Sequence, residues 1–178
     1  MSLDQITRPA PSTHRVSSNV LVGSAIGTTG LLAGLYYGYA VSVMPALHAS
    51  SDRTMVEAMQ EINRAIQNPV FFVTFMGAPA ISLWAFLRAR RTESNEAMRW
   101  VAAGFGLNVL GLLISFAFNI PLNNTLDKAG DPARMTDIAA VRHHFENPWI
   151  VWNIVRTVVT TAAFGCLARV AFLRRRTA

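Results

Sequence analysis

The chain has 178 residues, of which 52% are hydrophobic and 15% are charged, and its mean hydropathy is positive. This composition is too apolar for an ordinary soluble domain. The single cysteine, Cys166, excludes an internal disulfide. The net charge of +6 is spread over loops and the C-terminus, which is a topology signal and not a nucleic-acid patch. The sequence therefore predicts one small membrane domain with membrane lipids, and no nucleic acid, as partners.

Four apolar segments are each long enough to cross a bilayer as helices. They cover residues 20–44, 69–87, 100–120 and 149–172. Residues 1–19 are polar and predict a retained cytoplasmic arm, because no signal-peptide cleavage site follows them. Residues 174–178 form a basic tail. The predicted fold is an all-α four-transmembrane-helix bundle over residues 20–173.

The charges of the connecting segments predict the orientation of the bundle. The loop 88–99 holds four arginines and two glutamates, and the tail contains three consecutive arginines at 174–176. The loops 45–68 and 121–148 have nearly balanced charges. Because positive charge favours the cytoplasmic side, we expect both termini inside the cell membrane and the two longer loops outside.

Each outer loop carries a pattern typical of an amphipathic helix. The apolar positions with helical spacing are Met55, Met59, Ile62 and Ile66 in the first loop, and Met135, Ile138, Val141 and Phe145 in the second. The second helix is expected to begin at Asp131 and Pro132. Each pattern ends at an Asn-Pro pair, and Asn68-Pro69 and Asn147-Pro148 therefore predict the starts of the second and fourth spans.

The prolines also indicate an internal repeat. Pro45 and Pro121 lie 76 positions apart, and Pro69 and Pro148 lie 79 positions apart. A nearly constant shift is typical of two tandem helical hairpins, each with a span, a loop helix and a second span. The pseudo-twofold axis would then run along the membrane normal. Chance placement of the prolines is the alternative.

The first span combines glycines with tyrosines. Gly30, Gly34 and Gly38 recur every four residues along one face, which predicts close packing against another helix. Tyr36 and Tyr39 follow in the outer half of this span. Their rings are expected either to face the interior of the bundle or to lie in an interfacial aromatic belt.

An arginine stands inside the fourth span. Arg156 lies eight residues beyond Pro148, about 12 Å along a helix. A charge near mid-membrane costs about 2.5–3.5 kcal/mol and usually faces a partner or a wet cavity. No Asp or Glu falls within the four apolar segments. The partner is therefore an amide, a phenol, a backbone carbonyl, a loop carboxylate or a bound anion.

Polar and aromatic side chains gather at the outer end of the predicted bundle. Asn153 shares a helix face with Arg156, beside Trp149 and Trp152. Other candidates for the same pocket are Tyr36, Tyr39, His48, Asn63, Gln67, Asn119, Asn123 and His144. The alternative is that the amides serve only as hydrogen bonds between helices. Because adjacent histidines diverge on a helix and no metal-binding spacing occurs, no metal site is predicted.

Four strings resemble a known family: S-V-M-P-A-L (42–47), M-Q-E-I-N-R-A-I-Q-N-P (59–69), F-N-I-P-L-N-N-T-L (118–126) and W-x-x-W-N-x-V-R-T (149–157). These are similar to signatures of the anthrone-oxygenase-like family of four-span membrane proteins. The resemblance implies the four-span fold. It also implies oxidation of a hydrophobic anthrone by molecular oxygen without a classical cofactor.

The resemblance and the polar residues can be joined in one mechanism. Removing a proton from an anthrone gives an electron-rich enolate, which can pass an electron to oxygen. We expect Arg156 and Asn153 to stabilise the enolate oxygen and His48 or His144 to act as the base. The remaining candidates would bind the substrate: Tyr36, Tyr39, Asn63, Gln67, Asn119, Asn123, Trp149 and Trp152. The alternative is a non-enzymatic module that binds or transports a lipid, quinone or small anion. The sequence leaves the oligomeric state open.

Overall fold

The structure is a computed structural model that describes residues 13–176, with side chains for residues 18–174. Residues 1–12 of the predicted N-terminal arm and the last two residues of the tail lie outside this part. Among the described residues all regular elements are helical: α1 (Thr13–Gly38), η1 (Tyr39–Val43), α2 (Met44–His48), α3 (Asp52–Ala65), α4 (Pro69–Thr92), α5 (Asn95–Ile114), η2 (Ser115–Asn119), α6 (Ile120–Lys128) and α7 (Ile138–Arg176). The elements η1 and η2 are short π-helical segments.

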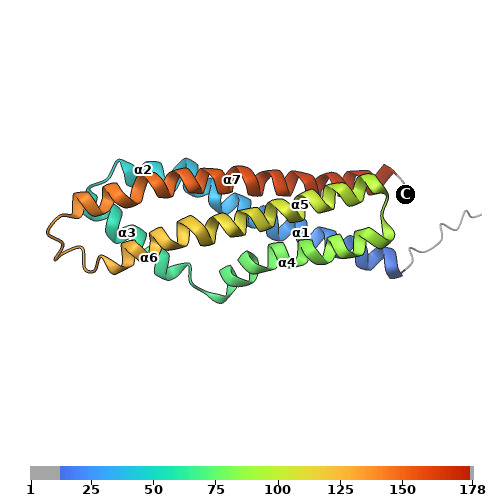
Figure 1. Cartoon of the computed structure of the whole chain (residues 1–178), viewed down its shortest axis with the longest axis horizontal. Coiled ribbons are helices and arrows are strands. Elements are labelled where there is room, and N and C mark those ends of the chain that lie inside the picture. Colours follow the sequence, from blue (N-terminus) through green and yellow to red (C-terminus); the bar gives the residue numbers. More distant parts are fainter. Residues whose placement is uncertain (1–12, 177–178) are drawn as a thin grey trace, which may run out of the picture.

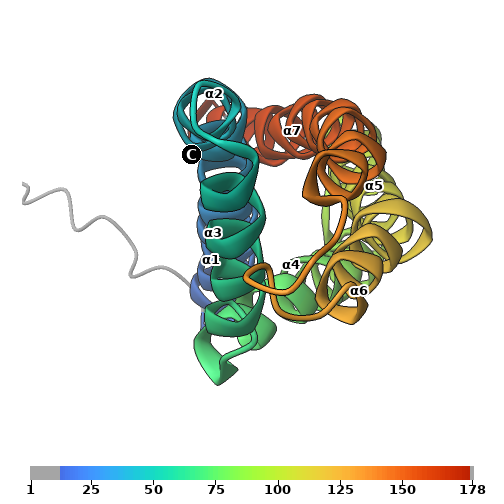
Figure 2. The same cartoon turned by 90° about the vertical axis from the view of Figure 1, so that its left-hand side faces the viewer.

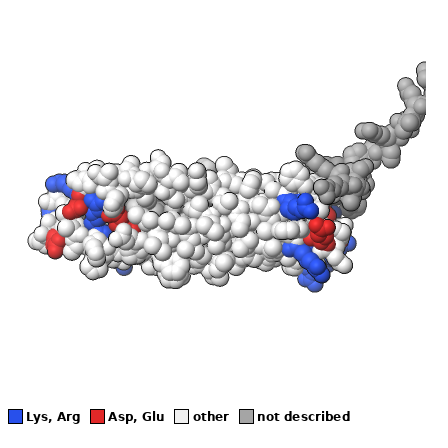
Figure 3. Space-filling view, turned by 90° about the horizontal axis from the view of Figure 1, so that it is seen from above, with Lys and Arg blue, Asp and Glu red and all other residues white. Residues whose placement is uncertain are grey.

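Four continuous helical stretches are long and apolar enough to cross a membrane. They are Ser18–His48, Pro69–Thr92, Asn95–Lys128 and Ile138–Arg174. They lie alongside one another in an elongated bundle (Figure 1). On the face seen in Figure 3, Lys, Arg, Asp and Glu gather at the two ends of the bundle, and the surface between them is uncharged. The predicted all-α four-span fold is therefore confirmed, and the helices indicate a membrane protein.

The two ends of the bundle differ in what they carry. The first residues of α1, the α4–α5 turn and the last residues of α7 lie at one end, which we call the terminal end (Figure 1). At this end Arg174 donates to the Ser18 carbonyl at 3.0 Å and to Glu93 at 2.6 Å. The other end, the loop end, carries α2, α3 and α6, and α3 runs there from α2 toward α4 (Figure 2). That the terminal end faces the cytoplasm stays a prediction.

The start of α4 agrees with the sequence, whereas the start of α7 does not. Asn68 accepts a hydrogen bond from the Phe71 amide at 3.0 Å and caps α4. In contrast, α7 begins at Ile138, where Asp137 accepts from the Ala140 amide at 2.9 Å. It then continues through Pro148 without a break. The prediction that Asn147-Pro148 starts the fourth span is therefore wrong.

The second loop helix is likewise part of α7. Residues 131–137 are not helical, and Asp131 accepts from the Ala133 amide in a turn. The amphipathic pattern from Ile138 to Phe145 is helical, but it forms the first turns of α7. Pro148 removes one backbone hydrogen bond, to the carbonyl four residues earlier. That carbonyl belongs to the exposed His144, so the surroundings compensate for its loss more easily than a buried site would.

The repeat is visible in the odd-numbered spans. The segments η1 and η2 lie 76 positions apart, the same shift as Pro45 and Pro121, which follow them. A proline ring clashes with the carbonyl four residues earlier, here Val41 or Ala117, and both of these lie in the π-helical segment. The wider π turn relieves this clash. The even-numbered spans differ, because only α4 begins at its Asn-Pro pair.

Of the three glycines predicted to pack closely, only Gly30 does so. A Cβ at Gly34 or Gly38 would meet no atom within 4 Å, whereas one at Gly30 would lie 3.1 Å from Phe164. The predicted packing face is therefore wrong at Gly34 and Gly38. The tightest approach joins α5 to α7, where a Cβ at Gly104 would lie 2.7 Å from Leu167.

The terminal half of the bundle is filled by apolar side chains. Val101, Leu167 and Val170 are completely buried there. Toward the middle, the Asn108 amide donates to Thr29 and to Ser82, both at 3.0 Å. These polar groups satisfy one another, and the Asn108 amide therefore joins α5 to α1 and α4 through interhelical hydrogen bonds.

Candidate functional site

A pocket of about 230 Å³ lies in the loop-end half of the bundle. The elements α1, η1, α3, α4, η2, α6 and α7 all contribute to its wall. Eight of the predicted site residues line it: Tyr36, Tyr39, Asn63, Gln67, Asn119, Asn123, Trp149 and Arg156. The fold therefore brings together residues that are up to 120 positions apart in the sequence.

Arg156 is the charged group at the inner end of this pocket. Its side chain is 8% exposed. It donates to the Ser115 hydroxyl at 3.3 Å and to the Asn153 side-chain oxygen at 3.0 Å. The guanidinium carbon lies 4.3 Å from the ring centre of Tyr36 and 5.7 Å from that of Trp149. Neutral dipoles and aromatic faces thus hold the cation, and within the described residues no carboxylate forms an ion pair with it.

Asn153 positions Arg156 without lining the pocket. Its side-chain oxygen accepts from Arg156, and its amide nitrogen donates to the backbone carbonyl of Tyr36 at 3.1 Å. The two bonds join α7 to α1 and fix the orientation of the amide. The predicted proximity of Asn153 and Arg156 on one helix face is therefore confirmed.

Aromatic rings form much of the remaining wall. The Trp149 indole donates to Asn123 at 2.8 Å, and its ring centre lies 5.6 Å from that of Tyr39. On the opposite side Phe71 and Phe75 are stacked at 5.2 Å. Hydrogen-bonded and stacked rings of this kind make a rigid apolar cavity for a flat ligand.

Several buried polar atoms along the pocket wall have no hydrogen-bond partner. They are the Arg156 Nε, the Asn119 Oδ1, the Asn63 Nδ2 and the Asp127 Oδ1. Buried polar groups are normally paired, because leaving one unpaired costs about 1–3 kcal/mol. Four such atoms around one cavity indicate that a ligand or water completes their hydrogen bonds.

Two residues at the pocket were missed in the sequence. Ser115 contacts Arg156, and the carboxylate of Asp127 lines the outer part of the pocket. Both follow the same spacing of four residues as Asn119 and Asn123. This polar periodicity along the third span was a usable signal for the whole set.

Three predicted site residues lie elsewhere. His48 is hydrogen-bonded through Nδ1 to Glu146 at 2.8 Å, and its side chain is 71% exposed. His144 is exposed and lies 2.7 Å from the Ala140 carbonyl. Trp152 stacks on Phe118 with 3.5 Å between ring centres. The roles assigned to them stay predictions, but none lines the pocket. Within residues 18–174 no group of three His, Cys, Asp or Glu side chains is placed to hold a metal.

Comparison with known proteins adds one finding. A family model described as Anthrone oxygenase matches residues 69–166, which is more than half of the 178 residues. The match contains α4, α5, η2 and α6 and extends into α7, so it includes Asn119, Trp149 and Arg156. Searches of curated proteins and of solved structures returned no match. On the family match, the chain belongs to the anthrone oxygenase family.

Proposed function

We propose that the pocket binds a flat aromatic ketone of the anthrone type and that the protein catalyses its oxidation by molecular oxygen. The reaction uses no metal and no organic cofactor in this proposal. The observation that carries it is the buried Arg156, which has only neutral partners and one unpaired N–H at the inner end of an aromatic pocket. An oxygen that gains negative charge is the natural partner for that N–H.

The chemistry begins with the loss of a proton from the methylene carbon of the anthrone. The resulting enolate gives one electron to oxygen, so that a carbon radical and superoxide form together. These two combine in a carbon–oxygen bond to give a peroxide. The remaining proton on that carbon then leaves as the O–O bond breaks, and the elements of water are lost. One anthrone and one oxygen molecule thus give one anthraquinone and one water.

Arg156 accelerates the first step of this sequence. Its free N–H and the guanidinium charge stabilise the enolate oxygen more than the neutral ketone, and this difference lowers the barrier. The apolar walls strengthen the effect, because few water molecules compete for the charge. Asn153 and Ser115 hold the guanidinium in place before the substrate binds.

Asp127 is the proton acceptor in this proposal. Asp127 lies eight residues beyond Asn119, about 12 Å farther along the helix. This distance is too long for direct proton transfer from a ligand that lies beside Asn119. The proton therefore reaches the carboxylate through water in the pocket. His48 and His144 take no part in this route, because neither of them lines the pocket.

The closed terminal half of the bundle favours an enzyme over a transporter. A transport path would have to pass between Val101, Leu167 and Val170, which are completely buried. Between this layer and the pocket the polar groups of Asn108, Thr29 and Ser82 bond to one another. The pocket therefore ends inside the bundle.

Binding can be tested with tryptophan fluorescence. We expect anthrone to quench the emission of the purified protein under nitrogen, because Trp149 lines the pocket and would contact the ligand. The matched control is Trp84→Phe, since Trp84 is an exposed tryptophan on α4. The saturable quenching should persist in Trp84→Phe and should largely vanish in Trp149→Phe. Equal saturable quenching in both variants would place the ligand elsewhere.

A further inference from the structure

The pocket is closed toward the tip of the loop end. Met55, Val56 and Met59 of α3 pack on Leu126 of α6 and on Phe145 of α7 in one buried apolar cluster. This packing holds the end of α3 over the space between the spans. A ligand therefore meets a continuous apolar layer at the tip.

Two sets of hydrogen bonds, which we call polar clamps, hold α3 in this position over the pocket. Gln60 on α3 donates to the carbonyls of Leu126 at 2.9 Å and Gly130 at 3.0 Å, just beyond the pocket. Arg142 on α7 donates to the carbonyl of His48 at 2.8 Å and to that of Ser50 at 2.9 Å, in the turn before α3. Because both clamps use backbone carbonyls, they fix the position of the chain itself.

The side of the bundle between α4 and α6 is different. Phe72, in the first turn of α4, lines the pocket and is also 48% exposed. Gln67 before α4 and Asn124 on α6 likewise line the pocket and are exposed. Residues that belong to the pocket wall and to the outer surface at once mark its mouth.

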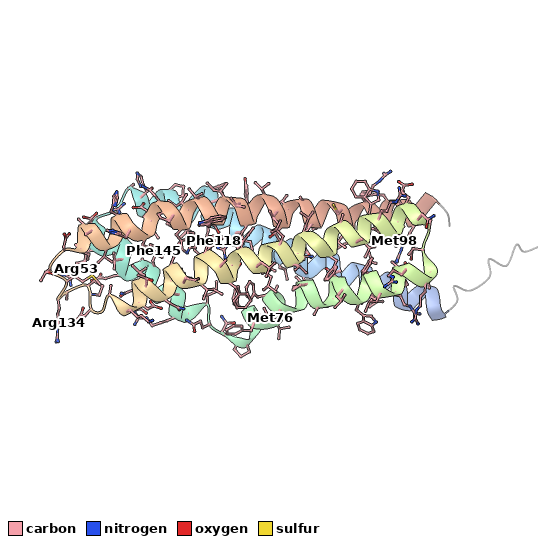
Figure 4. The ribbon with its side chains drawn as sticks, in the orientation of Figure 1. Arg53, Met76, Met98, Phe118, Arg134 and Phe145 are labelled. Carbon is pink, nitrogen blue, oxygen red and sulfur yellow. The ribbon has the colours of Figure 1, made fainter. Side chains whose placement is uncertain are left out.

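The surface around this mouth is apolar. Val70 and Val73 on the first turns of α4 are 77% and 72% exposed, and Met76 on the same helix is also exposed (Figure 4). These residues belong to a helix that is apolar enough to cross a membrane. Exposed side chains of this kind on a spanning helix face acyl chains, not water.

We propose that the aromatic ligand enters the pocket sideways from the lipid bilayer, between the first turn of α4 and α6, with Phe72 at the entrance. Only the identity of the ligand rests on the proposed function. The route itself rests on the closed tip and on the side opening. An apolar ligand concentrates in the bilayer, so a side entrance gives it a path that avoids water.

The competing route runs from the aqueous surface. A polar groove between α3 and the segment after α6 is lined by Glu57, Glu61, Arg64 and Asp131, and Asp127 borders both this groove and the pocket. Gln60 lines the groove as well, and its two hydrogen bonds cross from α3 to the α6 side. These bonds close the passage in the structure, so the two entrances can be opened or narrowed separately.

Cysteine labelling separates the two routes without using an anthrone. Ser115 is buried and lines the pocket, and Ser115→Cys nearly preserves its shape. In a Cys166→Ala background, which removes the natural thiol, the protein in liposomes is treated with a neutral membrane-partitioning maleimide or with a sulfonated maleimide. We expect the neutral reagent to label Ser115→Cys much faster. Adding Phe72→Trp should slow this labelling severalfold, whereas adding Gln60→Ala should not.

The controls keep the test decisive. Phe116→Cys, next to Ser115 but 53% exposed, should react with the neutral reagent whether or not Phe72 is changed. If Ser115→Cys does not fold, Asn63→Cys is the second reporter, since Asn63 is buried in the pocket wall. Fast labelling by the sulfonated reagent, or no effect of Phe72→Trp, would overturn the side entrance. Neither result would touch the proposed oxidation, which is measured separately.

Discussion

Replacing Arg156 with Lys is expected to lower the rate of anthraquinone formation roughly a hundredfold or more while the bundle stays folded. Lysine keeps the charge but loses the planar fork, with which Arg156 bonds to Ser115 and Asn153 and still offers a free N–H. A single ammonium cannot hold both partners in the same geometry and also bind the enolate oxygen. The rate is measured by the absorbance of the quinone, with the purified protein in liposomes.

A matched variant and a stability measurement separate catalysis from folding. Arg169→Lys changes an arginine that is 3.5 Å from Glu96 at the terminal end, and it should leave the rate unchanged. Thermal unfolding of Arg156→Lys in detergent should stay close to wild type, and anthrone should raise the melting temperature of the wild type only. If Arg156→Lys unfolds early and anthrone protects neither protein, Arg156 only joins helices.

The second large effect is expected at Gly104. In Gly104→Leu the Cβ alone would lie 2.7 Å from the Leu167 Cγ and 3.4 Å from the Ala163 carbonyl oxygen. Since α5 and α7 must then move apart, we expect the free energy of unfolding to fall by about 1–3 kcal/mol or more. Gly34→Leu is the matched control, because Gly34 is exposed and a Cβ there meets no atom within 4 Å.

Thermal unfolding in detergent compares the two glycine variants. The melting temperature of Gly104→Leu should fall by many degrees, whereas that of Gly34→Leu should stay near the wild-type value. The opposite order would mean that the α1 face, and not the α5–α7 contact, is the tight interface of the bundle.

The spans could be predicted because hydropathy over 20 residues is a strong signal that loops and neighbours do not alter. Helix ends were less certain. Asn68-Pro69 and Asn147-Pro148 are the same dipeptide, yet only the first begins a helix. The difference lies in what precedes each pair: α3 ends at Ala65, three residues before Asn68, whereas the residues before Asn147 already belong to α7, which begins at Ile138. A local pattern does not contain that information.

The candidate site, like the helix ends, could be predicted from the sequence only in part. Arg156 and Asn153 could be paired from sequence, since three residues along a helix fix their relation. His48 and His144 could not be placed, because the sequence predicted both in loops, whereas His48 ends α2 beside Glu146 and His144 lies in the first turns of α7. The glycine prediction was wrong at Gly34 and Gly38 for a related reason: spacing identifies a helix face, but only the arrangement of helices shows which part of that face meets a neighbour.

Oxygen uptake is the most direct test of the proposed oxidation. Purified protein in liposomes is given anthrone, and oxygen consumption and anthraquinone formation are recorded together, with metal chelator present throughout. We expect a protein-dependent rate well above spontaneous oxidation, with one oxygen molecule consumed for each anthraquinone formed, and with that rate lost in Arg156→Lys. A rate equal to that of empty liposomes, or one unchanged by Arg156→Lys, would contradict it.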